Sequence, residues 1–418
     1  MALKSAGCKF LLLGIIGFFI CNVACTQTKN INYFLDTAVK FSPLLNDLNN
    51  QLLSARIDSQ ILRATTLPQI TSSGNSFYAP VTNGYGYDAI LTNQGQLQGL
   101  VTLTKSLLPK KLLNAQFQSI KNSGDSLWIA AKITEKDLKK AIISQYIITY
   151  GDQLQTDFNL ELHKLLSSEE QILKKLTRSN VYRQVDYLSF LVTYQQQNLA
   201  LQQLDLQYKN DYATLTYLSG LIDTTVSKLE EPAMTVYIAD TGDSSVFRLK
   251  YTTDSLRLVN ARDLINLGYK PRINLFADAG IQSSLQLQPY KNFGYSFGIN
   301  YLIPIYDGGQ KRLQQSKINI AERTRVRNKE FFMRQHDQQI AQLTQQLTAT
   351  NNLLALIRKQ IKYIETLIQA NGRLLVTGDI KLTDYILAVN NYITAQNLIV
   401  QNRVARLQII NQINYWSK

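Results

Sequence analysis

Apolar and polar residues follow two different periods along this chain, and each period predicts its own type of element. Two long stretches, residues 110–231 and 305–418, contain no proline and carry Leu, Ile, Gln, Ala and Lys at helical spacing. In the second stretch this spacing links Leu353, Leu354, Ile357, Ile361, Ile364 and Ile368. Both stretches are therefore predicted to be long helices.

Strict alternation predicts strands in the proline-containing regions. Residues 293–303 place Phe, Tyr and Ile on one face and Gly, Ser and Asn on the other, and residues 272–282 behave likewise. Weaker counterparts lie at 69–79 and 96–104.

Strands of about 10 residues with one apolar face and aromatic ends are typical of a transmembrane β-barrel. On this interpretation Phe297, Ile299 and Tyr301 face lipid. A water-soluble sandwich is the alternative, but it would have to bury this face against a second sheet, and four strands leave little to form one.

The two halves of the chain repeat each other at an offset of 198 residues. The segment VDYLSFLVTYQQQNLALQQ from Val185 reappears as TDYILAVNNYITAQNLIVQ from Thr383, so that Asp186 corresponds to Asp384. The segments that begin at Thr102 and Asn300 match at the same offset. A period this long is not that of a solenoid repeat. It predicts an internally duplicated unit of strands and long helices.

Each helical stretch has a predicted break near its middle. One straight helix of 110 residues would be about 165 Å long, which is improbable for a single element. Asn180 and Gly378 are equivalent at the 198-residue offset, and Asn and Gly most readily adopt the left-handed conformation that ends a helix. Two helical hairpins are expected, with turns near Asn180 and at Gly378-Asp379.

The N-terminus has the layout of a secretory signal, predicted over residues 1–24. Lys4 and Lys9 precede an apolar stretch of 11 residues, too short for a membrane span. Cys25 follows Val23-Ala24 as in a lipoprotein signal, with ordinary cleavage nearby as the alternative. All three cysteines lie in or beside this segment, so no disulfide or thiolate metal site is expected in the mature chain.

The net charge of +14 adds little to the functional interpretation of the sequence. Basic clusters, such as Lys174, Lys175 and Arg178, lie in helical patterns without a recognisable nucleic-acid-binding module, so we expect no nucleic acid partner. Solvated helix faces explain these clusters best, and contact with an acidic partner is the alternative.

Enzyme chemistry has little support in the sequence. Gly294-Tyr295-Ser296-Phe297-Gly298 fits GxSxG, but this motif needs a strand-turn-helix elbow, and here the serine lies inside an alternating strand. His163 and His336 are the only histidines, and neither has a neighbouring ligand cluster. We expect no catalytic residue, metal or cofactor. Because there is no P-loop, any energy must come from a partner.

Four strands cannot close a membrane barrel, because known barrels begin at eight. An open sheet edge in lipid would leave backbone groups without hydrogen bonds. Other copies must therefore complete the sheet, and three chains would supply 12 strands.

The chain resembles the TolC-type outer-membrane efflux proteins over its mature length. The resemblance rests on the duplication, on LPQI at Leu67 and YKPRINL at Tyr269, on PIYDGGQKR from Pro304, and on GDIKLTDYILA from Gly378. It implies a mainly α chain with a membrane β-barrel portion. Three such chains form a 12-stranded outer-membrane barrel, four strands from each, continued by a periplasmic α-helical barrel. The implied role is a passive exit duct in a Gram-negative outer membrane.

The resemblance also implies partners and site residues. A periplasmic adaptor and an inner-membrane transporter of RND, ABC or MFS type would complete the assembly. Asp384 and Asp186 would lie at the periplasmic aperture, and Asn180, Gly378 and Asp379 at turns that contact the adaptor; simple turn caps are the alternative for both aspartates. Some members have an arginine and an acid, which can form ion pairs that close the aperture, where this chain has Ile380 and Leu387. We therefore do not expect a gate closed by such ion pairs here.

These inferences divide the chain into seven segments. They are the signal (1–24), an N-terminal periplasmic helical segment (25–66), the first strand pair (67–105), the first hairpin (106–220), an equatorial linker with a helix (221–268), the second strand pair (269–304) and the second hairpin (305–418). The competing function is a periplasmic helical-hairpin adaptor or structural protein without a membrane barrel. The sequence does not indicate the cargo.

Overall fold

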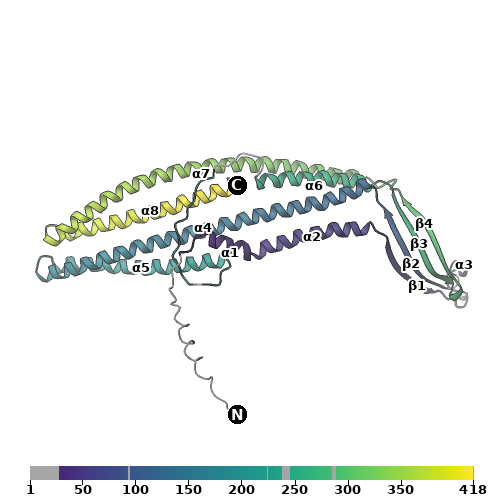
Figure 1. The fold of residues 1–418 in the computed structure, drawn as a ribbon, viewed down its shortest axis with the longest axis horizontal. Coiled ribbons are helices and arrows are strands. Elements are labelled where there is room, and N and C mark those ends of the chain that lie inside the picture. The colour runs from purple at the N-terminus through teal and green to yellow at the C-terminus, as the bar shows by residue number, and fades with distance from the viewer. Residues whose placement is uncertain (1–27, 93–94, 224, 238–244, 285–288, 418) are drawn as a thin grey trace, which may run out of the picture. The chain divides into compact units, whose positions relative to one another are not determined.

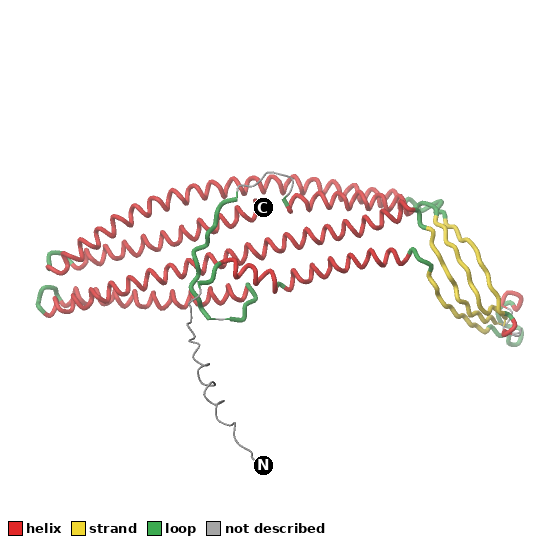
Figure 2. Tube along the Cα trace, viewed as in Figure 1, coloured by secondary structure: helices red, strands yellow, loops and turns green. Residues whose placement is uncertain are grey.

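The computed structural model of this protein describes residues 28–92, 95–223, 225–237, 245–284 and 289–417. The predicted signal and Cys25 lie outside these residues. The described chain is mostly helical, with one four-stranded sheet (Figures 1 and 2). Its elements are α1 (Ile31–Phe41), α2 (Pro43–Thr65), β1 (Gln69–Tyr78), α3 (Ala89–Thr92), β2 (Gly95–Leu107), α4 (Lys110–Arg178), α5 (Gln184–Leu218), α6 (Val246–Gly268), β3 (Arg272–Ser284), a 3-10 turn (Pro289–Lys291), β4 (Phe293–Leu302), α7 (Gln310–Thr377) and α8 (Leu382–Ser417).

Local sequence explains where several helices begin and end. Pro43 occupies the first turn of α2, where its missing N–H costs nothing, and the Leu45 N–H donates to the Ser42 hydroxyl as an N-cap. Ahead of α7 the Asp307 carboxylate accepts from the N–H groups of Gly309 and Lys311 at 2.9 and 2.7 Å. Within the described part of the chain, no helix combines the length and apolar character that crossing a bilayer requires.

The chain divides into two compact units. Among the described residues, the first unit comprises those within 28–40, 141–235 and 349–408, and the second those within 41–140, 236–348 and 409–417. The sheet belongs to the second unit. The two helix turns belong to the first.

The sheet of the second unit has the strand order β1-β2-β3-β4, and every neighbouring pair is antiparallel. The structure thus confirms the four strands that alternation predicts, within a few residues at each end. Some rows of directly opposite positions keep one character across all four strands. One row is apolar (Ile70, Leu103, Ala277, Phe297), and the next is polar (Thr71, Thr102, Asp278, Ser296).

Aromatic side chains hold the end of the chain against the helices of the second unit. The ring of Phe247 in α6 lies 5.5 Å from that of Tyr415 and 5.3 Å from that of Trp416. The Tyr415 hydroxyl also donates a hydrogen bond to Asp137 in α4. The last turn of α8 is therefore fixed against α4 and α6.

In the first unit α5 packs on α4, α4 on α8, and α8 on α7. The Tyr208 hydroxyl of α5 donates to Gln153 of α4 at 3.1 Å, and the rings of Phe158 in α4 and Tyr392 in α8 lie 5.5 Å apart. Arg406 of α8 donates to Asn351 of α7 at 2.9 Å. Near the turns, all four helices contribute to one buried cluster, made of Leu162, Leu166, Leu173, Phe190, Leu375, Leu382, Tyr385 and Val389.

Candidate functional site

The candidate site lies at the two turns that join the helices of the first unit. The first turn connects α4 to α5 through Asn180, and the second connects α7 to α8 through Gly378 and Asp379. Both turning residues have left-handed backbones, with φ of 61° at Asn180 and 81° at Gly378, as the sequence predicts.

The two turns use the same hydrogen bonds at the 198-residue offset. The Val181 N–H donates to the Leu176 carbonyl at 2.9 Å, and the Asp379 N–H donates to the Leu374 carbonyl at 3.0 Å. These six-to-one bonds are those of a Schellman motif. A Cβ added at Gly378 would also lie 2.8 Å from the Val181 side chain. Glycine is thus required there for two separate reasons.

The two aspartates begin the helices that leave these turns. Asp186 lies in the first turn of α5 and is partly exposed, and Asp384 lies in the first turn of α8 and is exposed. A carboxylate at a helix N-terminus interacts favourably with the helix dipole. In the described part of the chain neither carboxylate has a hydrogen bond or an ion pair. Both therefore remain available to solvent, ions or another copy.

A tyrosine that sequence reasoning missed connects the two turns. The Tyr182 hydroxyl, in the first turn, lies 3.1 Å from the carbonyl oxygens of both Leu375 and Ile380 in the second. Its one hydrogen is donated to these carbonyls. Burial raises the pKa of Tyr182, and the nearby Asp379 and Asp186 raise it further. The tyrosine thus brings Asp186 and Asp379 to the same end of the unit.

Ile380 and Leu387 make no polar side-chain contribution to this closure. Ile380 packs against the buried cluster and offers only its backbone carbonyl to Tyr182, whereas the Leu387 side chain is exposed. The hairpins are joined at the turns through a neutral hydroxyl and two carbonyl oxygens.

The repeated tyrosines face two adjacent glutamates of α4. The Tyr187 hydroxyl donates a hydrogen bond to Glu170. Its counterpart Tyr385, in α8, is buried beside Glu169. Burial raises the pKa of Glu169, and the Tyr385 hydroxyl lowers it by a smaller amount. One glutamate thus contacts its own hairpin, and the other faces the second hairpin.

In the second unit the predicted lipid-facing side chains lie on one exposed face of β4. Phe297, Ile299 and Tyr301 alternate with Gly298 and Asn300, and all three point away from other residues of the chain. On the opposite face the Ser296 hydroxyl donates to Asp278 at 2.8 Å. The serine of the GxSxG pattern therefore lies within a regular strand and bonds to its neighbour.

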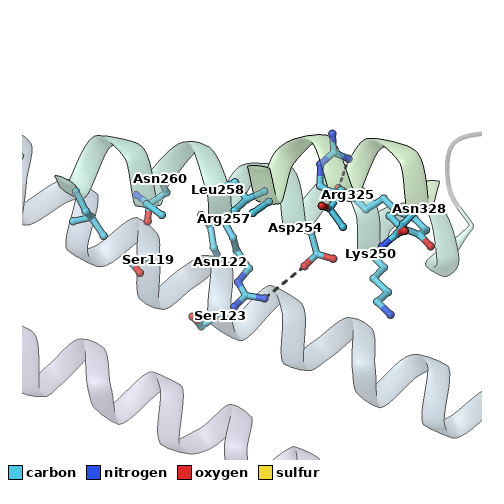
Figure 3. A pocket seen from close by; sticks show the side chains of 15 residues that line it. Ser119, Asn122, Ser123, Lys250, Asp254, Arg257, Leu258, Asn260, Arg325 and Asn328 are labelled. Atoms are coloured by element: carbon cyan, nitrogen blue, oxygen red, sulfur yellow. Dashed lines mark hydrogen bonds and ion pairs between the residues drawn. The ribbon is translucent and has the colours of Figure 1, made fainter. Parts of the chain in front are cut away.

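A polar cavity of about 700 Å³ lies among α4, α6 and α7 of the second unit (Figure 3). Apart from Lys250, which has no ion pair among the described residues, the charged groups that line it are engaged. Arg257 pairs with Asp254 at 3.5 Å, while Arg325 donates to Glu322 at 2.7 Å and to the Tyr251 carbonyl at 3.1 Å. Asn260 on its wall donates to the Ala115 carbonyl at 3.0 Å. These bonds hold α4, α6 and α7 together around the cavity.

Solved structures with this arrangement of elements are outer-membrane channels. VceC of Vibrio cholerae is 13% identical, with a TM-score of 0.75 over 93% of this chain and 96% of its own. CmeC of Campylobacter jejuni is 13% identical, with a TM-score of 0.72 over 94% and 86%. MtrE of Neisseria gonorrhoeae, in its open state, is 11% identical, with a TM-score of 0.73 over 92% and 88%.

No protein-family model and no curated protein matches the sequence. At these identities the likeness concerns the fold. The chain has the fold of the TolC-type outer-membrane efflux channels, which are channel proteins and not enzymes.

Proposed function

We propose that this chain, with the fold of a TolC-type channel, is the passive outer-membrane exit duct of a tripartite efflux or type I secretion system. Three copies would build a 12-stranded barrel in the outer membrane of a Gram-negative bacterium, and their helices would continue as a periplasmic tunnel. A periplasmic adaptor and an energised inner-membrane transporter of RND, ABC or MFS type would complete the system.

The sheet carries this proposal. One of its faces is mostly apolar, interrupted by Ser72, Ser76 and Lys105, and among the described residues the outer strands β1 and β4 each have one unpaired edge. In lipid every backbone N–H and carbonyl needs a hydrogen-bond partner, which an isolated four-stranded sheet cannot provide. Pairing β4 of one copy with β1 of the next satisfies both edges, and three copies exceed the minimum of eight strands.

Two exposed apolar stripes in the first unit support the same assembly. On α5 the stripe repeats every seven residues (Val185, Val192, Leu199, Leu206), and on α7 it comprises Leu353, Leu356, Tyr363, Leu367 and Leu374. Every one of these side chains is at least 43% exposed. The adjoining face of α7 is buried against α8 through Ile357, Ile361 and Ile364. An apolar stripe that α8 leaves uncovered needs a second neighbouring helix.

The two stripes match level by level when measured from the turns. Val192 is twelve residues past Asn180, and Leu367 is eleven residues before Gly378. The pairs Val185 with Leu374 and Leu206 with Leu353 lie at equally matched depths. Since Tyr182 holds the two turns together, α5 of one copy can pack antiparallel along α7 of the next. A contact of this kind, between two different surfaces, gives a closed ring when the rotation between copies closes after three steps.

In that ring the two aspartates would lie at the periplasmic aperture. Three copies of Asp384 converging on one axis would attract cations, and Asp186 would contribute from the first turn. The turn residues Asn180, Gly378 and Asp379 would meet the adaptor. Cys25, which lies outside the described residues, stays a prediction as a lipidation site.

Fractionation and electrical recording test this function. An exit duct should remain with the outer membrane after a high-salt wash, and the purified protein should form steady channels in planar bilayers. A helical-hairpin adaptor, the competing function, would leave the membrane in salt and conduct nothing. Recovery only in the soluble periplasmic fraction would rule out the duct.

A further inference from the structure

The first turn of the helical unit carries a groove with an unusual excess of positive charge. Its volume is about 740 Å³, and its nine lining residues include Lys174, Arg178 and Arg183 but no aspartate or glutamate. We refer to these three basic residues and the space they surround as the first-turn groove.

The basic residues of the first-turn groove form no ion pair among the described residues, although Glu170 and Asp186 lie nearby. Lys174, Arg178 and Arg183 are all exposed. Lys174 and Arg178 are four residues apart on α4, so their side chains share one helix face. Three like charges around one groove repel each other.

The position of Arg183 is unfavourable in a second way. It is the N-cap residue of α5, and its side chain makes no capping hydrogen bond. The N-terminal end of a helix carries partial positive charge, which disfavours a cation there. Lys174 and Arg178, near the C-terminal end of α4, have the opposite and favourable placement. An anion in the groove would offset the cost of Arg183.

The second turn has no such cluster. At the 198-residue offset Gly372 and Val376 replace Lys174 and Arg178, and only Lys381 retains the charge of Arg183. The two turns share their backbone geometry but differ in charge. The positive groove is thus a property of the first turn alone, and a ligand drawn to it would distinguish one turn from the other.

We infer that the first-turn groove docks an acidic segment of a protein partner. This inference rests on the proposed function, in which these turns are the end that meets the adaptor. A groove of this size is far larger than an inorganic anion. Beside the charges it offers the Val181 side chain, 46% exposed, and the polar side chain of Gln184, which is exposed. Apolar and hydrogen-bonding groups beside a positive field suit a peptide carrying two or more carboxylates.

A labelled peptide of ten glutamates is the probe for this groove. Its binding to the purified, assembled protein is measured by fluorescence anisotropy at about 0.15 M salt, where long-range attraction is largely screened. Lys174→Gln, Arg178→Gln and Arg183→Gln together should weaken binding by at least about tenfold, since the three charges act on one ligand. The matched control is Arg373→Gln with Lys381→Gln at the second turn, which should change binding less than about twofold.

Two results would contradict docking at the first-turn groove. Equal weakening in the triple variant and the control would show that the peptide is attracted only to the net positive charge. That result would overturn the inference that the first-turn groove is a docking site. So would binding to phosphatidylglycerol vesicles that depends on the three residues while the peptide does not bind. Arg183→Gln alone repeats the test if the triple variant fails to assemble. Channel conductance is recorded on the same preparations, so loss of the duct and loss of the groove are seen separately.

Discussion

The Tyr182 hydroxyl lies 3.1 Å from the carbonyl oxygen of Ile380, and these two residues occupy the same position in the two halves of the chain, 198 residues apart. The first half thus supplies a hydroxyl where the second supplies a backbone acceptor. The contact joins two turns whose own hydrogen bonds are the same. An asymmetric closure of this kind can be broken by removing a single oxygen atom.

Tyr182→Phe should loosen the contact between the two turns. The loss of one partly buried hydrogen bond is expected to cost about 1 kcal/mol, and the carbonyls of Leu375 and Ile380 would lose this donor. If the turns form the aperture, the variant should conduct more than the wild type in planar bilayers. Tyr187→Phe is the matched control, because its hydroxyl contacts Glu170 within the first hairpin. Equal conductance in both variants would contradict a closing role for Tyr182.

Asp152→Asn should raise stability at neutral and alkaline pH. Asp152 in α4 is only 6% exposed, and burial followed by the neighbouring Asp211 of α5 raises its pKa from 3.8 to about 7. When the pKa of a carboxyl is higher in the folded state than in the unfolded state, the free energy of unfolding falls as pH rises from about 4 to 7. The Gln207 amide donates to one Asp152 oxygen at 3.3 Å, and among the described residues the other oxygen has no partner.

The expected gain for Asp152→Asn at pH 8 is on the order of 2 kcal/mol, and it should vanish near pH 4. Thermal unfolding in detergent across this pH range measures it. Asp205→Asn on α5, which breaks the exposed pair with Lys209, is the control and should keep the wild-type pH dependence. A gain of the same size at pH 4 and pH 8 would argue against a raised pKa for Asp152.

The two faces of β4 should respond differently to an added charge. If Phe297 faces lipid, Phe297→Arg near mid-membrane should destabilise the barrel by about 2 to 4 kcal/mol, and Ile299→Arg should behave alike. Asn300→Arg, on the opposite face, should assemble and mainly alter ion conductance. Unfolding in denaturant and channel recording measure the two effects. Similar damage from all three substitutions would reverse the assignment of the faces.

Asp384→Ala should reduce cation selectivity and block by multivalent cations without changing the yield of assembled protein. Three carboxylates in a narrow mouth concentrate counter-ions, and Asp384 is exposed and unpaired within the described chain. Asp186→Ala should have a weaker effect, because its side chain is less exposed. Reversal potentials in a salt gradient report the change. Unaltered selectivity in a correctly assembled Asp384→Ala protein would leave this residue a role only in starting α8.

Local patterns were sufficient to predict the elements of this fold. The absence of proline and the helical spacing indicate α4, α5, α7 and α8, and strict alternation indicates β3 and β4. Asn180 and Gly378 could be placed at the turns because few residues adopt a left-handed backbone without strain. Each of these signals lies within a short stretch of the chain.

The contacts between hairpins could not be predicted in this way. In the sequence, Tyr182 looks like an ordinary aromatic residue just before a helix. Only the packing of one hairpin against the other brings its hydroxyl to the Ile380 carbonyl. Asp152 has the sequence appearance of an exposed helical acid, yet α5 covers it. The first-turn groove likewise combines residues of α4 and α5 on either side of the break at Asn180. Side chains that meet across helices leave no periodic signal.

Cysteine cross-linking tests whether three copies close into one ring through α5 and α7, as we propose. A chain carrying both Val192→Cys and Leu367→Cys is oxidised in the assembled state and separated under denaturing, non-reducing conditions, with each single variant as control. We expect covalent dimers and trimers that stop at three chains, and no such ladder in either single variant. A ladder extending beyond three chains, or cross-linked product that remains monomeric, would contradict it.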